Sequence, residues 1–179
     1  FLGQRIDGMR PDQVCLSGIG RTFQLVKPFA GLTVLDNVIV GALRRNKQVG
    51  VARRKAQAIL ERLGLAEKRD QPAAALTLPE RKRLEVARAL ATEPRLLLLD
   101  EAMAGLRPTE TDQMVAIFRR LNEEHGLTIL LIEHVMRAVM ALSREIHVLH
   151  HGELIASGSP DEVVRHPAVL ECYLGEEAV

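Results

Sequence analysis

The sequence has few cysteines, few aromatic residues and no long apolar run. Its 179 residues include two cysteines, four phenylalanines, one tyrosine and no tryptophan. With only Cys15 and Cys172 it has no disulfide framework and no C-x-x-C motif, so we expect free thiols and a reducing compartment. The longest apolar runs, at 96–99 and 127–132, are far shorter than the roughly 18 to 20 residues that cross a bilayer, so we expect no transmembrane helix and no signal peptide.

The chain also lacks a strong net charge, which limits its partners. With 24 basic and 23 acidic side chains the formal charge is +1, so no large field draws the whole chain to nucleic acid or anionic lipid. Basic clusters at 44–45, 53–55 and 81–83 lie among acids, and few aromatics are present to stack on bases, so we expect solvated helix faces there. What the chain does have is 47% apolar residues, enough to fill the core of a domain.

Hydrophobic periodicity divides the chain into three stretches. Residues 1–24 predict a strand, a short helix and a second strand. Residues 27–92 are mostly helical, with a capping pair at Thr33 and Asp36. Residues 93–179 alternate between strand and helix. We therefore expect an α/β fold with parallel core strands, an inserted helical subdomain, and a C-terminal antiparallel hairpin followed by helices.

The two apolar runs predict the core strands. Neither alternates with polar residues, as expected of parallel strands that are buried on both faces. Pro108 begins a helix between them, so together they form a β-α-β unit. The segment 145–158 predicts a hairpin at the edge of the sheet, turning at His151 and Gly152, and a helix begins at Ser159.

Both predicted strands end in ionisable side chains. The first runs into Asp100 and Glu101, and the second into Glu133 and His134. Open α/β sheets bind ligands at the carboxyl ends of their strands, so these four groups should lie near one another. Two adjacent carboxylates there suit a hydrated Mg²⁺ and a base that orients water, as in phosphoryl transfer. The alternative, that strands simply end in polar residues, is less expected when two consecutive strands do so.

The segment LTLPERKRLE, residues 76–85, has two compatible interpretations. Thr77 as N-cap and Glu80 at N3 form a capping box, and Pro79 is tolerated in the first turn, so the segment is a good helix start. A helix N-terminus is also a ready site for an anion.

Several motifs, in order along the chain, resemble those of ATP-binding cassette (ABC) ATPases. LTLPERKRLEVARALATEPRLLLLDE resembles the signature helix running into the Walker B strand. RTFQ at 21–24 resembles the Q-loop, AGLRP at 104–108 the D-loop, and ILLIEH at 129–134 the switch-histidine strand. More narrowly, IGRTFQLVKPFAGLTVLDNVIVGAL and ECYLGEEA resemble ATPase subunits of importers for branched-chain amino acids. The fold that this resemblance implies is a P-loop NTPase-like ABC ATPase domain divided at 1–26, 27–92 and 93–179.

The resemblance also implies the roles of particular residues. Glu101 would polarise the attacking water, His134 would contact the γ-phosphate, and Gln24 would sense metal and nucleotide. Thr77 and the amides from Leu78 onward would close over the nucleotide that a second subunit holds. The implied catalytic residues are Glu101, His134 and Gln24, the cofactor-binding residues Thr77, Leu78, Glu80, Asp100 and Gly105, and the Mg²⁺ residues Asp100 and Gln24.

The implied cofactors are ATP and Mg²⁺. The implied partners are a second ABC ATPase subunit, bound head to tail, and transmembrane permease subunits, with no nucleic acid and no direct solute binding. The implied location is peripheral, at the cytoplasmic face of the inner membrane.

The chain departs from the family pattern in three places. The usual L-S-G-G-Q is Leu-Thr-Leu-Pro-Glu, in which Pro79 has no N–H for a phosphate and Glu80 adds negative charge. The position of the D-loop aspartate is Arg107. GQRIDG at 3–8 has the glycine spacing of a Walker A loop, but Met9 and Arg10 follow in place of Lys and Ser or Thr, so we expect a turn there.

These departures leave three hypotheses. The chain is the ATP-hydrolysing subunit of an importer, or it is a non-catalytic interaction module that lacks the Walker A part and cannot hydrolyse ATP alone. A third hypothesis is an ABC ATPase outside transport, in DNA repair or translation.

Overall fold

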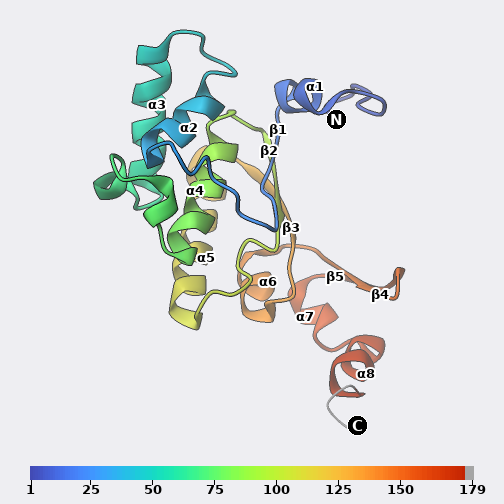
Figure 1. Cartoon of the computed structure of the whole chain (residues 1–179). Coiled ribbons are helices and arrows are strands. Elements are labelled where there is room, and N and C mark those ends of the chain that lie inside the picture. The colour runs from blue at the N-terminus through green and yellow to red at the C-terminus, as the bar shows by residue number, and fades with distance from the viewer. Residues whose placement is uncertain (176–179) are drawn as a thin grey trace. The chain divides into compact units, whose positions relative to one another are not determined.

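The protein divides into two compact units, Phe1–His134 and Val135–Val179, of which the computed structural model describes residues 1–175 (Figure 1). The first unit is α/β, as predicted. Its elements are α1 (Pro11–Ser17), β1 (Ile19–Arg21), α2 (Val34–Ala42), α3 (Val49–Arg62), α4 (Leu78–Leu90), β2 (Leu96–Asp100), α5 (Pro108–His125) and β3 (Thr128–Ile132), with 3₁₀ turns at Ala66–Lys68 and Ala73–Ala75.

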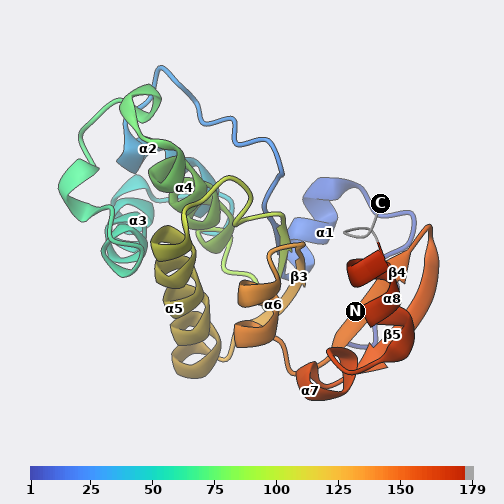
Figure 2. The ribbon, with the colours of Figure 1, turned by 90° about the horizontal axis from the view of Figure 1, so that it is seen from below.

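The three strands of the first unit form a parallel sheet in the order β1-β2-β3. Leu98 of β2 lies between Arg21 of β1 and Leu130 of β3, and Asp100 pairs with Ile132. Helices α4 and α5 lie on the same side of the strands in both views (Figures 1 and 2). The adjacent carboxyl ends of β2 and β3 therefore place the residues that follow each strand at one rim.

The two faces of this sheet differ in burial. Leu97 and Leu99 are fully buried on one face, whereas Leu130 and Ile132 on the other are 57% and 65% exposed. The prediction that both core strands are buried on both faces is therefore wrong for β3. The physical reason is that no described element of the first unit covers the side chains of Leu130 and Ile132.

Local sequence signals explain the helices of the predicted 27–92 segment. Oγ1 of Thr33 accepts a 3.0 Å hydrogen bond from the amide of Asp36, which caps α2 as predicted. Helix α3 stops before Gly64, whose φ of +66° lies in the left-handed region. Asn37, fully buried on α2, uses its amide group to hold the main chain of Phe29.

The first ten residues form turns, and the strand predicted there is wrong. Gly3 and Gly8 have φ of +77° and +76°, which breaks an extended chain. The segment GQRIDG is thus a turn, as expected. Helix α1 then begins at Pro11 with a capping box, in which the amide of Arg10 donates to Oε1 of Gln13 over 3.0 Å.

The second unit contains α6 (Met136–Leu142), β4 (Ile146–His150), β5 (Glu153–Gly158), α7 (Pro160–Val163) and α8 (Pro167–Gly175). The predicted hairpin is confirmed, with φ of +48° at His151 and +84° at Gly152 in its turn. Its predicted place at the edge of the parallel sheet is wrong, because β4 and β5 form a separate two-stranded sheet in the described chain. Helix α6 was not predicted; the apolar residues of MRAVMAL could have indicated it.

A small core holds the second unit together. Ala156, Val163 and Val169 are buried there, and Ile146 and Val148 pack against them. The predicted start of α7 is confirmed, since the amide of Ser159 donates to Glu162 over 2.8 Å. Within residues 1–175, no helix combines the length and the apolarity that a membrane span requires.

Candidate functional site

The rim at the carboxyl ends of β2 and β3 brings together the predicted catalytic residues. Glu101 directly follows β2, and its amide donates to the carbonyl of Ile132 over 3.0 Å. Its φ of +46° is unusual for a residue other than glycine, and such strain is often found at functional sites. The hydrogen bond to Ile132 at the end of β3 helps to hold Glu101 in this conformation.

Two residues from other elements surround the Glu101 carboxylate. Nε2 of Gln24 donates to Oε2 of Glu101 over 2.6 Å, and Nδ1 of His134 lies 3.9 Å from Oε1. The His134 ring is largely exposed, so its pairing with Glu101 is weak in this arrangement. Each carboxylate oxygen of Glu101 thus faces one of the other two residues predicted as catalytic.

Asp100, the predicted Mg²⁺ residue, is paired with an arginine that the sequence analysis did not single out. Nη2 of Arg21 donates to Oδ2 of Asp100 over 3.0 Å, and the amide of Asp100 donates to Oγ1 of Thr22 over 3.3 Å. Arg21 follows from the register, because β1 lies beside β2. A cation that approaches Asp100 must compete with this guanidinium.

The polar side chains at this rim can hold Mg²⁺ only if water and phosphate oxygens supply most of its ligands. Within residues 1–175 no group of three or more His, Cys, Asp or Glu side chains is arranged to hold a metal. Mg²⁺ commonly takes one or two carboxylates and fills its other positions with water and phosphate oxygens. Asp100, with Gln24 and Glu101 beside it, supplies that kind of site.

The start of α4 contains the other predicted cofactor-binding residues. The amide of Thr77 donates to Oε2 of Glu80 over 2.9 Å, and the predicted capping box is confirmed. Oε1 of Glu80 pairs with Nζ of Lys68 at 2.6 Å. Burial raises the pKa of Glu80, but the bonds from Lys68 and Thr77 outweigh it and leave the pKa lowered. The negative charge of Glu80 is therefore neutralised within this chain.

The loop after β2 packs against the start of α4. Gly105 has φ of +77°, and a Cβ placed on it would lie 3.3 Å from Cδ2 of Leu78. Arg107 caps α5, because its amide donates to Oε2 of Glu110 over 2.8 Å. The predicted site residues thus fall into two groups, one around Glu101 and the other formed by Thr77, Leu78, Glu80 and Gly105.

A large hollow lies beside the strand that leads to Gln24. It measures about 670 Å³ and is lined by α1, β1, α2, α4 and the loop after β1. Phe23 and Leu25 of that loop are 60% and 71% exposed. Phe29 lies under Arg88 of α4, 4.8 Å from the guanidinium carbon to the ring centroid. An apolar surface of this kind indicates an interaction site.

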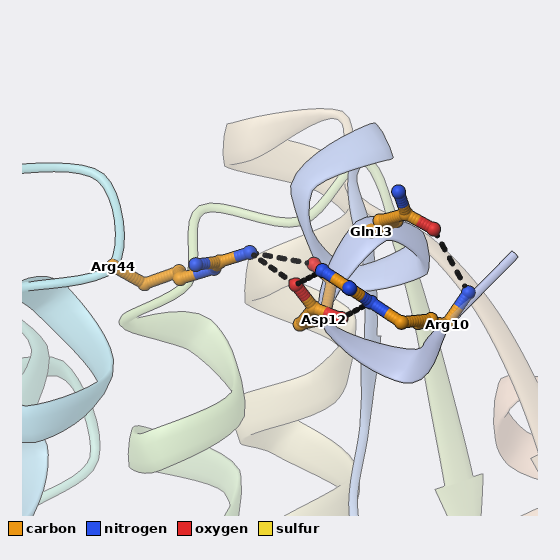
Figure 3. A network of polar contacts seen from close by, with 4 residues as sticks. All are labelled: Arg10, Asp12, Gln13 and Arg44. Atoms are coloured by element: carbon orange, nitrogen blue, oxygen red, sulfur yellow. Dashed lines mark hydrogen bonds and ion pairs between the residues drawn. The ribbon is translucent and has the colours of Figure 1, made fainter.

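An ionic network joins two walls of this hollow. Nη2 of Arg44, just after α2, donates to the carbonyl of Asp12 on α1 over 2.8 Å and lies 3.5 Å from its Oδ2 (Figure 3). Arg10 pairs with the same carboxylate at 3.1 Å. The network fixes α1 against the helical segment.

Sequence reasoning missed Lys82 as well as Arg21. Lys82 is buried on α4, and its Nζ donates to the carbonyl of Glu101 over 2.8 Å. The sequence did contain a signal that Lys82 faces the core, because it precedes the buried Val86 by one helical turn and so shares its helix face.

The parallel sheet presents carboxylates, a glutamine and a histidine at its rim, and a helical segment is joined to it. This is the architecture of an α/β nucleotide-binding ATPase domain. The family model described as "ABC transporter" matches residues 3–104, and the one described as "Branched-chain amino acid ATP-binding cassette transporter" matches residues 153–179. The chain belongs to the ABC transporter family of ATP-binding proteins.

Its relatives include the high-affinity branched-chain amino acid transport ATP-binding protein LivG of Salmonella typhimurium. The two are 37% identical over 190 residues, which cover 97% of this chain and 74% of LivG. BraF of Pseudomonas aeruginosa, with the same description, is 36% identical with the same coverage. The crystal structure of the ADP conformation of MJ1267, an ATP-binding cassette of an ABC transporter, superposes with a TM-score of 0.84 at 29% identity, covering 98% of this chain and 75% of MJ1267.

Proposed function

We propose that this chain is the ATP-hydrolysing subunit of an ABC importer for branched-chain or related amino acids. The observation that carries the hydrolysis is the Glu101 carboxylate held between Gln24 and His134. The likeness to LivG and BraF supports the substrate class.

In this proposal the residues at the rim orient and activate a water molecule. When bound, Mg²⁺-ATP supplies the phosphoanhydride to be cleaved and a metal ion that neutralises its charge. Glu101 accepts a proton from water, while Gln24 keeps one of its oxygens in a fixed orientation. Asp100, now paired with Arg21, would hold the hydrated metal ion, and His134 would donate to a phosphate oxygen. The exposure of His134 leaves it accessible to that oxygen.

The second group of residues serves a nucleotide on another copy or a related subunit. Thr77 and Leu78 are exposed, and the α4 N-terminus presents amides and the positive end of the helix dipole. Since Glu80 is already paired with Lys68, its charge does not prevent a phosphate from approaching. A head-to-tail dimer brings Thr77 of one subunit opposite the Glu101 group of the other.

The membrane partner binds at the hollow that Phe23 and Phe29 line. Phe23, which lines the hollow, and Leu25, two positions further on, are exposed and suit an apolar helical segment of a permease subunit. Gln24 lies between them in the loop that leads to α2. Nucleotide at the rim is thereby linked to the membrane subunit at the cytoplasmic face, where the chain is peripheral.

The decisive test is ATP hydrolysis by the native gene product, assembled with its membrane subunits, with and without Glu101→Gln. Glu101→Gln should lower turnover by about 10²-fold or more, as expected for loss of a positioned base. Glu61→Gln, an exposed position on α3, is the matched control and should leave turnover unchanged. Equal turnover of the Glu101→Gln variant and the wild type would refute the role of Glu101.

A second candidate is an interaction module that does not hydrolyse ATP. It is favoured by the absence of G-x-x-x-x-G-K-[ST] from these 179 residues, whose segment 3–8 is a turn. Mg²⁺-ATP turnover by the purified 179-residue chain would reject this candidate. The intact mass and N-terminal sequence of the native gene product should be measured together with that assay. They show whether the native product contains a P-loop in addition to these residues.

A further inference from the structure

The most unusual charged group outside the predicted site is the ammonium of Lys82. Its side chain is only 6% exposed, although lysine is almost never buried without a partner. It stands on α4, five residues after Thr77, which corresponds to roughly 7 Å along the helix at 1.5 Å per residue. A buried ammonium requires compensating acceptors, so its partners should matter.

The partner of Lys82 is the main chain of Glu101. Nζ of Lys82 donates to the Glu101 carbonyl over 2.8 Å, while the Glu101 amide donates to the Ile132 carbonyl over 3.0 Å. The Glu101 amide is thus held by β3, and its carbonyl is held by α4 and also by the amide of Ala104, which donates to it over 3.2 Å within the loop. These bonds stabilise the left-handed conformation of Glu101, with φ of +46°, which would otherwise be strained.

Glu133 holds the same loop from its other end. Oε1 of Glu133 accepts a 2.8 Å hydrogen bond from the amide of Met103, and its Oε2 is buried with no hydrogen-bond partner among the described residues. Burial lowers the pKa of Lys82, and the nearby carboxylates oppose this, Glu133 most strongly, then Glu101, Asp100 and Glu85. Glu133 is therefore the carboxylate whose charge acts most strongly on Lys82.

We propose that Lys82 is a positioning residue, which orients the peptide of Glu101 from the signature helix, and that Glu133 completes the clamp by holding Met103. Because α4 begins at the segment proposed to meet the nucleotide of the second subunit, Lys82 transmits a shift of that helix directly to Glu101. This inference rests on the proposed function. It assigns Lys82 and Glu133 to the same subunit's Glu101, whereas Thr77 acts across the dimer.

The test compares Lys82→Met, Lys82→Arg and Lys55→Met in the native gene product assembled with its membrane subunits. Lys82→Met keeps the length of the side chain but cannot donate to the Glu101 carbonyl. It should lower kcat for ATP hydrolysis by about 10- to 100-fold, the usual range for a supporting residue, with KM changed by less than about 3-fold. Lys82→Arg retains a donor and should recover part of the loss. Lys55→Met removes a lysine on α3 that pairs with Glu93 at a partly exposed position away from Glu101, and should match the wild type.

A second readout does not depend on hydrolysis. Amide hydrogen exchange of the Glu101–Met103 loop should become faster in Lys82→Met, with exchange in α5 unchanged, because the loop loses one anchor while the core stays folded. Glu133→Gln keeps an acceptor for the Met103 amide but removes the negative charge that acts most strongly on Lys82. It should lower kcat by less than Lys82→Met does.

The outcomes separate this inference from the proposed function. If the wild type does not hydrolyse ATP but the loop still exchanges faster in Lys82→Met, the proposed function fails and the clamp stands. If the wild type hydrolyses ATP and Lys82→Met matches it in kcat and in loop exchange, the inference is overturned. If Lys82→Met does not fold, the other two variants decide. The inference is overturned if Lys82→Arg and Glu133→Gln both have the kcat and the loop exchange of the wild type.

Discussion

Nε2 of Gln24 donates a hydrogen bond of 2.6 Å to Oε2 of Glu101, although 77 positions separate the two residues in the sequence. The parallel register of β1 and β2, with Arg21 opposite Leu98, explains the encounter, because the chain leaves both strands at the same rim. The loop that leads into the hollow therefore directly contacts the proposed base.

Gln24→Ala should lower ATP hydrolysis by the assembled native gene product by about 10- to 100-fold, since Glu101 loses the group that orients one of its oxygens. The measurement is steady-state turnover at saturating Mg²⁺-ATP. Gln71→Ala, an exposed glutamine before the turn at Ala73–Ala75, is the control and should have no effect. Wild-type turnover in Gln24→Ala would show that the hydrogen bond to Glu101 has no part in hydrolysis.

Much of the secondary structure could be predicted because local signals decide it. Thr33 with Asp36, and Thr77 with Glu80, mark the starts of α2 and α4, and both caps are present in the structure. The turn of the hairpin at Gly152 was likewise predicted from the sequence alone. In each case residues a few positions apart determine the conformation.

Contacts between distant segments could not be predicted in the same way. The exposure of Ile132 depends on which elements cover its face, which periodicity within β3 does not report. The hairpin of β4 and β5 forms its own sheet because strand pairing is a tertiary choice, and its alternation fits either arrangement. The bonds from Arg21 to Asp100 and from Lys82 to Glu101 need the register of the sheet and the packing of α4 before they can be seen.

Within the site, the sequence identified the rim residues but not all of their supports. Asp100, Glu101 and His134 follow from the rule that ligand sites lie at strand ends. Of their supports on other elements, Gln24 was indicated by the RTFQ motif, and the helical spacing of Lys82 from the buried Val86 was a further signal, whereas no motif marks Arg21.

Arg21→Met should reduce the Mg²⁺ concentration that gives half-maximal hydrolysis. The Arg21–Asp100 pair is partly exposed, at 3.0 Å, and such pairs contribute about 0 to 1 kcal/mol. Removing the competing guanidinium should therefore lower the required Mg²⁺ by up to about 5-fold, since 1.4 kcal/mol corresponds to a factor of about ten. The measurement is a Mg²⁺ titration of turnover at fixed ATP.

Arg5→Met is the matched control for Arg21→Met. Arg5 also pairs with an aspartate, Asp7, at 2.6 Å, but both lie in the exposed turns before α1 and away from the proposed site. Its Mg²⁺ titration should superpose on that of the wild type. An unchanged or higher Mg²⁺ requirement in Arg21→Met would contradict competition at Asp100.

Glu80 should give the chain a stability that depends on acid pH. Its folded pKa is lowered, because the bonds from Lys68 and Thr77 outweigh the effect of burial. A carboxyl with a lowered folded pKa stabilises the fold above its unfolded pKa, and this contribution is lost as the pH falls through the folded value. The loss should thus begin as the pH falls below the ordinary value of 4.5 and become larger toward lower pH.

The check is the free energy of unfolding in urea, measured between neutral pH and pH 3 for the wild type and Glu80→Gln. Gln retains an oxygen for the Thr77 amide, so the variant should be less stable than the wild type at neutral pH, and this difference should become smaller as the pH falls. Glu80→Ala also removes the cap and should cost about 1 kcal/mol more at neutral pH. A difference between the wild type and Glu80→Gln that stays constant with pH would show that the Lys68 pair does not influence stability.

Gly105→Ala should destabilise the first unit and disturb the contact with the signature segment. At φ of +77° an alanine is strained, which costs about 1 to 2 kcal/mol. The added methyl group would lie 3.3 Å from Cδ2 of Leu78, a half-exposed side chain that can move aside. Most of the cost should therefore come from the backbone. Gly31→Ala is the control, because its Cβ meets open space and its φ lies outside the left-handed region. By urea unfolding Gly31→Ala should be neutral or slightly more stable, and equal stability of the two variants would show that the positive φ at Gly105 is not maintained in solution.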